Sequence, residues 1–326
     1  MKGTTSAKAA STRKKRRFTQ DDFQLFLLSL PSTIWYLLLC YLPMFGLIIA
    51  FKKYKVAPGK GFLWSLFNNS AWCGLDNFRF LFANNKETTI NMFRNTIGYN
   101  IIFIILGIVL PVALAIMINH LRSERLAKVT QTAMFLPHFL SWVVVGYFVF
   151  AFLSTDNGLV NRMIQSFGGQ PVRWYQKEAI NYWPWFLIFL HMWKTIGYSM
   201  VVYLASIKGI DESLYEAAVI DGASKWQQIR YITLPHLRTM ISILLILNVG
   251  KIFAADFGLF YNVPMQNGAL FSVTQVIDTY IYRVFITTGN ISQSSAAGLL
   301  QNVIGFVCIM LANAVVKRID SESSLF

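Results

Sequence analysis

Long apolar runs separated by short polar segments dominate the chain. A membrane-spanning helix needs about 20 mainly apolar residues, and six runs reach that length. They cover Phe23–Phe51, Thr96–Asn119, Met134–Leu153, Trp185–Ala205, Met240–Phe260 and Ala296–Val316. The pattern predicts an all-α integral membrane protein with six transmembrane helices.

Composition supports a membrane protein, and the placement of charge indicates its orientation. Of the 326 residues, 55% are hydrophobic and 13% are charged, and the net charge is +14. Lys and Arg gather at the ends of apolar runs and form no single basic face, so they indicate membrane orientation and not nucleic-acid binding. The basic tail at residues 1–22 places the N-terminus in the cytoplasm. Six spans within residues 23–326 then return the C-terminus to the same side.

A polar segment at about 207–238 lies between the fourth and fifth expected spans, on the cytoplasmic side. Asp211 can cap a first helix from Ser213 to Ile220 through its side chain. Asp221 and Gly222 then end that helix, because Gly accepts a turn at no steric cost. The first half of the segment is therefore predicted to be a short helix followed by a sharp turn.

A second short helix is expected immediately after that turn. Ser224 and Gln227 have capping-box spacing. Trp226, Ile229 and Ile232 are expected on the buried side of the helix. The Leu-Pro pair at 234 and 235 is expected to end it, because Pro lacks a backbone N–H and restricts the residue before it. Two short helices at an angle, tied into spans on both sides, suit mechanical coupling to another protein.

The spacing within this segment resembles a known signature. The matching residues are Glu216, Ala217, Ala218, Gly222, Ile232, Leu234 and Pro235. They resemble the cytoplasmic loop of permease subunits from binding-protein-dependent ABC importers. GLDNFRFLF at 74–82 and DTYIYRVFI at 278–286 resemble the sugar-permease branch, and its LplB-like polysaccharide and oligosaccharide group in particular.

The resemblance implies a role and a set of partners. By this resemblance, the residues that would couple the chain to an ATPase are Glu216, Ala217, Ala218, Asp221, Gly222, Leu234 and Pro235. The partners implied are a second, usually non-identical permease, two ATPase subunits that bind ATP and Mg, and an extracellular solute-binding protein. The chain itself would hold no cofactor and would lie among the lipids of the bacterial cytoplasmic (inner) membrane. An amphipathic interfacial hairpin without a partner is the alternative for the loop.

Polar residues inside the fourth and fifth expected spans are candidates for contact with a carbohydrate. Ionisable groups at membrane depth are costly and mark functional sites. The candidates are Trp193, Lys194, Tyr198, Asn248, Lys251 and Asp256. Two lysines against one aspartate favour an acidic sugar such as a uronate. Alternatively, Lys251 pairs with Asp256, and Lys194 extends toward a membrane interface.

Other functional classes find less support. The chain carries no G-x-x-x-x-G-K-[ST] phosphate loop, so ATP hydrolysis would belong to a partner subunit. We find no metal-ligand spacing and no convergent catalytic residues, which argues against a membrane-embedded enzyme acting on glycan or lipid. An ion-driven secondary transporter would show inverted repeats and broken helices, and neither is evident in the sequence.

Overall fold

A computed structural model describes residues 20–83 and 86–319, so most of the predicted basic tail lies outside the described residues. Over these ranges the chain is helical except for connecting turns and one short antiparallel pair, β1 (Lys52–Lys53) with β2 (Ala71–Trp72). The chain divides into two compact units, Met1–Ile48 and Ile49–Phe326.

The described residues of the first unit, 20–48, form one apolar helix. It begins as α1 (Gln20–Tyr36), passes through a π-helical turn η1 (Leu37–Tyr41), and continues as the 3-10 helix η2 (Leu42–Phe51), whose last turn enters the second unit. Gln20–Phe51 is apolar and long enough to cross a membrane. No residue of α1 is buried.

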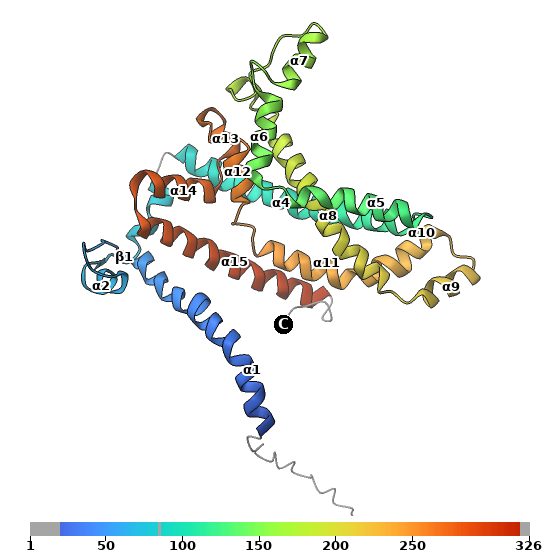
Figure 1. Ribbon diagram of the computed structural model, residues 1–326, viewed down its shortest axis with the longest axis horizontal. Helices are drawn as coiled ribbons and strands as arrows, with labels where there is room; N and C mark the ends of the chain where they lie inside the picture. Colours follow the sequence, from blue (N-terminus) through green and yellow to red (C-terminus); the bar gives the residue numbers. More distant parts are fainter. Residues whose placement is uncertain (1–19, 84–85, 320–326) are drawn as a thin grey trace, which may run out of the picture. The chain divides into compact units, whose positions relative to one another are not determined.

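The second unit is built on four further candidate spans. These are α4 (Lys86–Asn119), α8 (Trp183–Lys208), the continuous helix Lys225–Val249 and α15 (Ile291–Ile319). Helices α4 and α8 lie side by side (Figure 1). Val112 and Ala115 of α4 pack against Tyr203 and Leu204 of α8. The all-α fold with five or six spans agrees with the prediction.

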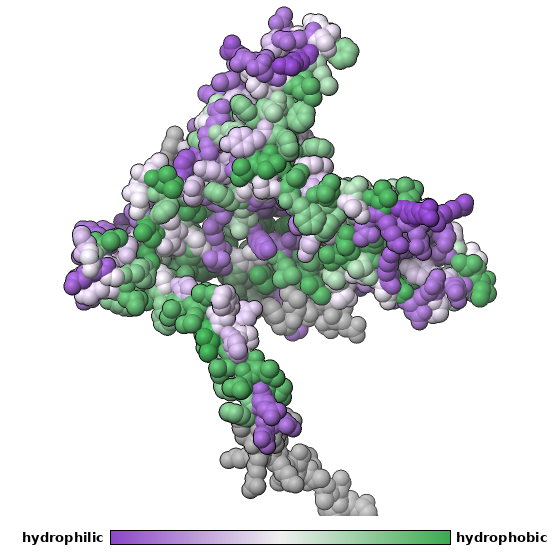
Figure 2. Space-filling model, in the orientation of Figure 1, coloured by the Kyte–Doolittle hydropathy of each residue, from purple (hydrophilic) through white to green (hydrophobic). Residues whose placement is uncertain are grey.

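Short helices join the spans at their two ends. They are α2 (Phe62–Asn68), η3 (Asp76–Phe78), α3 (Phe80–Ala83), α7 (Leu159–Ser166), η5 (Lys177–Ala179), α9 (Glu212–Ile220), α12 (Phe257–Asn262), η7 (Gly268–Leu270), α13 (Phe271–Thr274) and α14 (Ile277–Thr288). Within the second unit, α9 lies at the end opposite α14 (Figure 1). Hydrophilic residues gather over α7 and over the α9 end (Figure 2).

The third expected span is not one straight helix. The chain forms α5 (Glu124–Phe135), a 3-10 turn η4 (Leu136–Phe139) and α6 (Trp142–Leu153), and the two helical parts are bent by 95°. The bend has local causes. Pro137 cannot donate a backbone hydrogen bond, and the Ser141 side chain accepts the Val144 N–H to start a new helix. Sequence periodicity therefore predicted the apolar run at 134–153 but not its bend.

The fifth expected span is displaced from 240–260 to 225–249. We expected the Leu-Pro pair at 234 and 235 to end the preceding helix, but it does not. Instead α10 (Lys225–Gln228), a π turn η6 (Ile229–Thr233) and α11 (Leu234–Val249) form one continuous helix. In the π turn the Leu234 N–H bonds the Ile229 carbonyl, and the wider turn accommodates Pro235, which has no N–H to place.

The remaining expected boundaries shift by smaller amounts, and one expected face is wrong. The second span begins at Lys86 rather than Thr96, and the sixth begins at Ile291 rather than Ala296. The Trp226 side chain is 67% exposed instead of buried. Gln228 and Thr233 are the buried residues of that helical segment, and Ile229 and Ile232 of the expected face are half-buried.

Candidate functional site

A cavity of about 460 Å³ lies among α4, α8 and the segment that follows α11. We call it the central cavity. Its polar lining consists of Asn100, His138, His191, Thr195, Tyr198, Ser199, Asn248, Lys251 and Asp256. The structure therefore brings together four of the six residues predicted to contact a carbohydrate. Trp193 and Lys194 are not among the lining residues.

The wall of the central cavity includes a break in the fifth span. The helix stops at Gly250, and the next one, α12, starts after Asp256. Gly250 is required at the stop, because an added Cβ would lie 2.3 Å from the Ile309 side chain. This break is the second interruption of an expected span, after the bend between α5 and α6. The sequence did not reveal either of them.

Side chains from distant parts of the chain satisfy the exposed backbone of this break. The Asn100 amide donates to the carbonyls of Ile252 and Ala254, at 2.9 and 3.3 Å. The Gln301 amide donates to the Phe253 carbonyl at 2.8 Å. The Ala255 N–H donates to Asp278 Oδ2 at 2.7 Å. Irregular backbone at membrane depth persists only where such partners exist, so these side chains hold the break open.

Asp256 connects three elements at the edge of the cavity. Its Oδ1 accepts the Leu259 N–H at 3.3 Å and thereby caps α12. Its Oδ2 accepts the Trp142 indole N–H at 3.0 Å and lies 3.6 Å from His191 Nδ1. The alternative pairing of Asp256 with Lys251 is not among the ion pairs of residues 20–83 and 86–319, where Asp256 contacts Trp142 and His191 instead.

The two lysines predicted for this region have different surroundings. Lys194 Nζ donates to the His138 carbonyl at 2.8 Å and lies 5.4 Å from the centre of the Trp142 ring. Groups of the same chain therefore already bind this ammonium group. Lys251 lines the cavity, and within residues 20–83 and 86–319 the structure records no ion pair for it. Lys251 is thus the cation that the cavity presents.

Aromatic rings complete the cavity lining. Phe103 stacks on His191 with ring centres 3.8 Å apart, and Tyr198 stacks on His138 at 4.8 Å. Sequence reasoning gave no role to Asn100, His138 or Gln301. Asn100 left one usable signal, since it is a lone polar residue at the start of the apolar run IIFIILGIVL. The other two are recognised only through the fold.

The loop at 211–235 has the caps and the turn that its sequence predicted between Asp211 and Gln227, although Leu234 and Pro235 do not end its second helix. Asp211 accepts the Ser213 N–H at 3.0 Å, and this hydrogen bond lowers the pKa of the Asp211 carboxyl. Gly222 turns the chain at φ 78°, and Ser224 with Gln227 forms a complete capping box. A bond of 2.9 Å between the Tyr215 and Thr233 hydroxyls ties α9 to the following helix.

The outer surface of this loop is apolar as well as charged. No residue of α9 is buried, and Leu214 and Ile220 are 43% and 86% exposed. Glu216 and Ala217 are exposed and Ala218 is half-buried, while Asp221 is exposed. Leu234 is half-buried and Pro235 is exposed, at the start of α11. The predicted coupling residues therefore share one accessible end of the second unit, apart from the partly covered Ala218 and Leu234.

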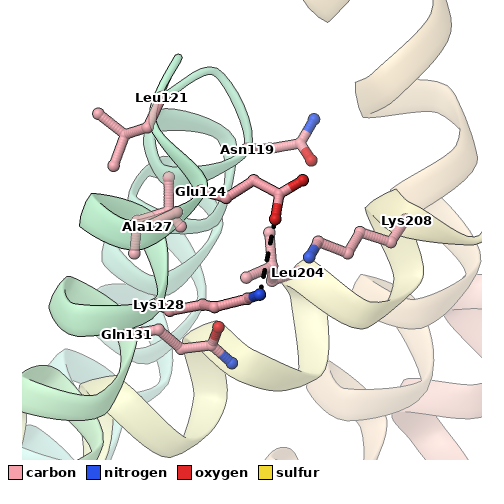
Figure 3. Close-up of a pocket in the computed structure, with 9 residues that line it drawn as sticks. Asn119, Leu121, Glu124, Ala127, Lys128, Gln131, Leu204 and Lys208 are labelled. Atoms are coloured by element: carbon pink, nitrogen blue, oxygen red, sulfur yellow. Dashed lines mark ion pairs between the residues drawn. The ribbon is translucent and has the colours of Figure 1, made fainter.

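A second cavity, of about 370 Å³, opens near the same end, between α5 and the last turn of α8 (Figure 3). Glu124 and Lys128 form an exposed ion pair of 3.5 Å there, and the Lys208 side chain extends toward the same space. Helix α8 runs from this cavity directly into the loop that carries α9. A movement of α9 would therefore reach α8 at this point.

A helical membrane unit with broken spans around a polar cavity and an exposed loop at one end is the architecture of a transport subunit. A protein-family model described as "Binding-protein-dependent transport system inner membrane component" matches residues 104–321. The chain therefore belongs to that family, which confirms the predicted resemblance. It is a permease subunit of the inner membrane and not an enzyme.

Individual relatives agree with this assignment. Protein LplB of Bacillus subtilis (strain 168) is 34% identical over 92% of this chain and 91% of its own length. The polygalacturonan/rhamnogalacturonan transport system permease protein YteP of the same strain is 35% identical over 91% of this chain and 89% of its own. Both relatives match over nearly their full length.

Solved structures show the same fold. A chain from a bacterial ABC transporter involved in the import of the acidic polysaccharide alginate matches with a TM-score of 0.78 and 34% identity, over 92% of this chain and 97% of that chain. A second structure, of the bacterial alginate transporter in complex with alginate pentasaccharide-bound periplasmic protein, matches with a TM-score of 0.77 and 34% identity, over 92% and 96%.

Proposed function

We propose that this chain is one permease subunit of an ATP-driven importer of oligosaccharides that contain uronate units. The observation that carries the proposal is Lys251, a cation on the wall of a polar cavity with no ion pair among the described residues. Polygalacturonan, rhamnogalacturonan and alginate, which appear in the descriptions of relatives, are consistent with an acidic saccharide.

The cavity lining suits a sugar. The Asn100 and Asn248 amides and the Thr195 and Ser199 hydroxyls are donors and acceptors of the kind that pair with sugar hydroxyls. The ring of Tyr198 offers an aromatic face at the same wall. Asp256 is held at the edge of the cavity by other groups, because its carboxylate accepts the Trp142 N–H and lies 3.6 Å from His191 Nδ1. A carboxylate on the sugar then has Lys251 as its partner.

The loop at 211–235 is the proposed link to ATP. Exposed Leu214 and Ile220 suit an apolar groove on an ATPase subunit, and Glu216 supplies a charge beside them. ATP and Mg would bind to two copies of that ATPase. Closure of the ATPase pair would move α9 and, through α8 and α11, open the central cavity outward, and hydrolysis would return it to face inward.

The remaining parts of the importer are proposed from the family. A second, non-identical permease would complete the pathway, and an extracellular solute-binding protein would deliver the saccharide. Both termini would lie in the cytoplasm of the bacterium, on the same side as α9. The basic residues between Lys2 and Arg17 support this orientation.

The test compares neutral and uronic oligosaccharides in proteoliposomes that contain the whole importer, with its binding protein added. Uronic oligosaccharides should stimulate ATP hydrolysis and uptake. Lys251→Gln should weaken the uronate preference by roughly ten-fold or more, because a hydrogen bond to a charged group contributes about 1.5–3 kcal/mol. Lys194→Gln is the matched control, since Lys194 is occupied by the His138 carbonyl, and it should keep the preference.

Two results would contradict the proposal. Stimulation by neutral sugars alone would remove the role assigned to Lys251. Uptake that continues without ATP and follows an ion gradient would favour a secondary transporter, which the broken spans alone do not distinguish from an ATP-driven one.

A further inference from the structure

Residues 52–83 form a small subdomain between the first span and α4, outside the 104–321 region that matches the family. It is organised around Lys52, which is only 3% exposed. Lys52 Nζ donates to the Leu66 carbonyl at 2.7 Å and lies 5.4 and 5.2 Å from the ring centres of Phe67 and Trp72. The subdomain is therefore held together from within by one buried cation.

The outer surface of this subdomain is unusually apolar for a connecting segment. Every exposed side chain between 62 and 67 is apolar or aromatic, and only Ser65 and Leu66 point inward. The exposed set is Val56, Phe62, Leu63, Trp64, Phe67, Trp72 and Leu75, with exposures from 46% to 68%. We call this set the aromatic patch. An exposed apolar patch of this kind marks an interaction surface.

Hydrogen bonds fix the height of the subdomain relative to the spans. The Asn77 amide donates to the carbonyls of Ala50 and Lys52, both at 2.9 Å, in the last turn of the first candidate span and just beyond it. The Tyr54 N–H donates to the Ser292 hydroxyl at 2.8 Å, in the first turn of α15. The subdomain is thus attached where two candidate spans end, and the ends of spans are where we expect the boundary of the bilayer.

We propose that the aromatic patch is a membrane-interface anchor, with its rings inserted among the lipid headgroups and upper acyl chains at the α14 end of the spans. Trp side chains prefer this region, since it accepts both an apolar ring and a polar N–H. The exposed lysines Lys53, Lys55 and Lys60 border the patch, and their positive charges are complementary to the negative lipid phosphates. Lys60 lies 5.6 Å from the Trp64 ring centre.

The charge and position of the patch favour lipid over a protein partner. Apolar and hydrophilic residues lie side by side over the α2 region, as on an interfacial helix (Figure 2). The anchor would keep the subdomain against the bilayer while the spans move. It does not depend on the identity of the transported sugar.

Lipid-depth quenching of single tryptophans tests the anchor in the complete reconstituted importer. Emission is compared in bilayers with and without bromine on the upper acyl carbons, and the signal of one tryptophan is the difference between the unmodified protein and its Trp→Phe variant. Trp64→Phe and Trp72→Phe keep a ring at each position, so the Lys52 and Lys60 contacts are preserved. Trp174→Phe is the control, because Trp174 is only 8% exposed and lies between α7 and η5, outside every candidate span and outside the proposed anchor.

The brominated lipids should remove the larger part of the Trp64 and Trp72 emission and leave the Trp174 emission unchanged. Aqueous iodide should have little effect on Trp64 and Trp72. If brominated lipids do not quench Trp72, and its emission changes only when the solute-binding protein is added, the proposal is overturned. The patch would then be a docking site for that protein. Equal quenching of Trp174 would also overturn it, since the loss would not be specific to the patch.

Discussion

The loop at 211–235 and the break at 250–256 both interrupt the helical path of the second unit, but they are held in different ways. The loop is shaped by neighbours in sequence, through the Asp211 cap, the Gly222 turn and the box formed by Ser224 and Gln227. The break is shaped by Asn100, Asp278 and Gln301, which are 152, 23 and 48 residues from the backbone groups they bond.

This difference indicates what each region can do. The loop is exposed, keeps its internal form and can move as a unit, which suits the transmission of a movement. The break depends on three other helices, so a change in their packing alters the wall of the central cavity. The predictions below separate these two kinds of support.

The largest effect is expected at Asp278. Asp278→Leu would leave the Ala255 N–H without its acceptor and remove one acceptor of the Gln301 amide. An unsatisfied buried group costs about 1–3 kcal/mol, so we expect a clear drop in the melting temperature of the purified importer and loss of uptake. Thermal unfolding followed by tryptophan fluorescence provides the measurement.

Asp278→Asn is the matched control. It keeps an oxygen for the Ala255 N–H and removes the charge. Burial raises the pKa of Asp278 and outweighs the hydrogen bonds from Ala255 and Gln301 that lower it, so burial makes the charge itself costly at this position. Asp278→Asn should therefore lose much less stability than Asp278→Leu. Equal losses in the two variants would show that the hydrogen bond does not hold the break.

The contrast also explains which features the sequence predicted. Apolar runs predicted the spans, and capping residues predicted the short helices around 211–228, because both depend on local pattern. The displacement of the fifth span was missed, because Pro235 is normally a terminator and the π turn that absorbs it leaves no sequence signal. In the cavity, Tyr198, Asn248, Lys251 and Asp256 were predicted from polarity within apolar runs.

The partners of these cavity residues depend on the fold. Nothing in sequence spacing pairs Asp256 with Trp142, 114 residues away, or Lys194 with the His138 carbonyl. The two-lysine argument therefore reduces to one lysine once these contacts are known. Long-range contacts decide which charged residue is free to act.

A smaller effect is expected from Gly222→Ala, which tests the loop. Gly222 has φ 78°, where a Cβ costs about 1–2 kcal/mol, and an added Cβ meets no atom within 4 Å. The penalty is therefore purely conformational. We expect normal assembly and basal ATP hydrolysis, with reduced stimulation by the binding protein and substrate.

Two companion variants sharpen this test of coupling. Gly222→Asn should lose less of the stimulation of ATP hydrolysis than Gly222→Ala, since Asn tolerates the left-handed region better than Ala. Glu216→Ala leaves the turn intact and removes the exposed charge, so it should reduce stimulation without altering the loop. Undiminished stimulation in both Gly222→Ala and Glu216→Ala would remove the coupling role proposed for the loop.

The smallest effect is expected from titration of Asp211. The Ser213 N–H lowers the pKa of this carboxyl below its ordinary value of 3.8, so the carboxylate stabilises the start of α9 at neutral pH. That contribution is fully present above the ordinary pKa and is lost as the pH falls through the lowered one. Hydrogen exchange of the first turn of α9, corrected for intrinsic rates, should show protection that decreases only in this acidic range. In Asp211→Asn the cap remains and the side chain at position 211 no longer titrates, so the part of the pH dependence that Asp211 contributes should disappear while Glu212 stays in the first turn. An unchanged pH dependence in Asp211→Asn would place the titrating group elsewhere and show that this cap contributes nothing measurable to the loop.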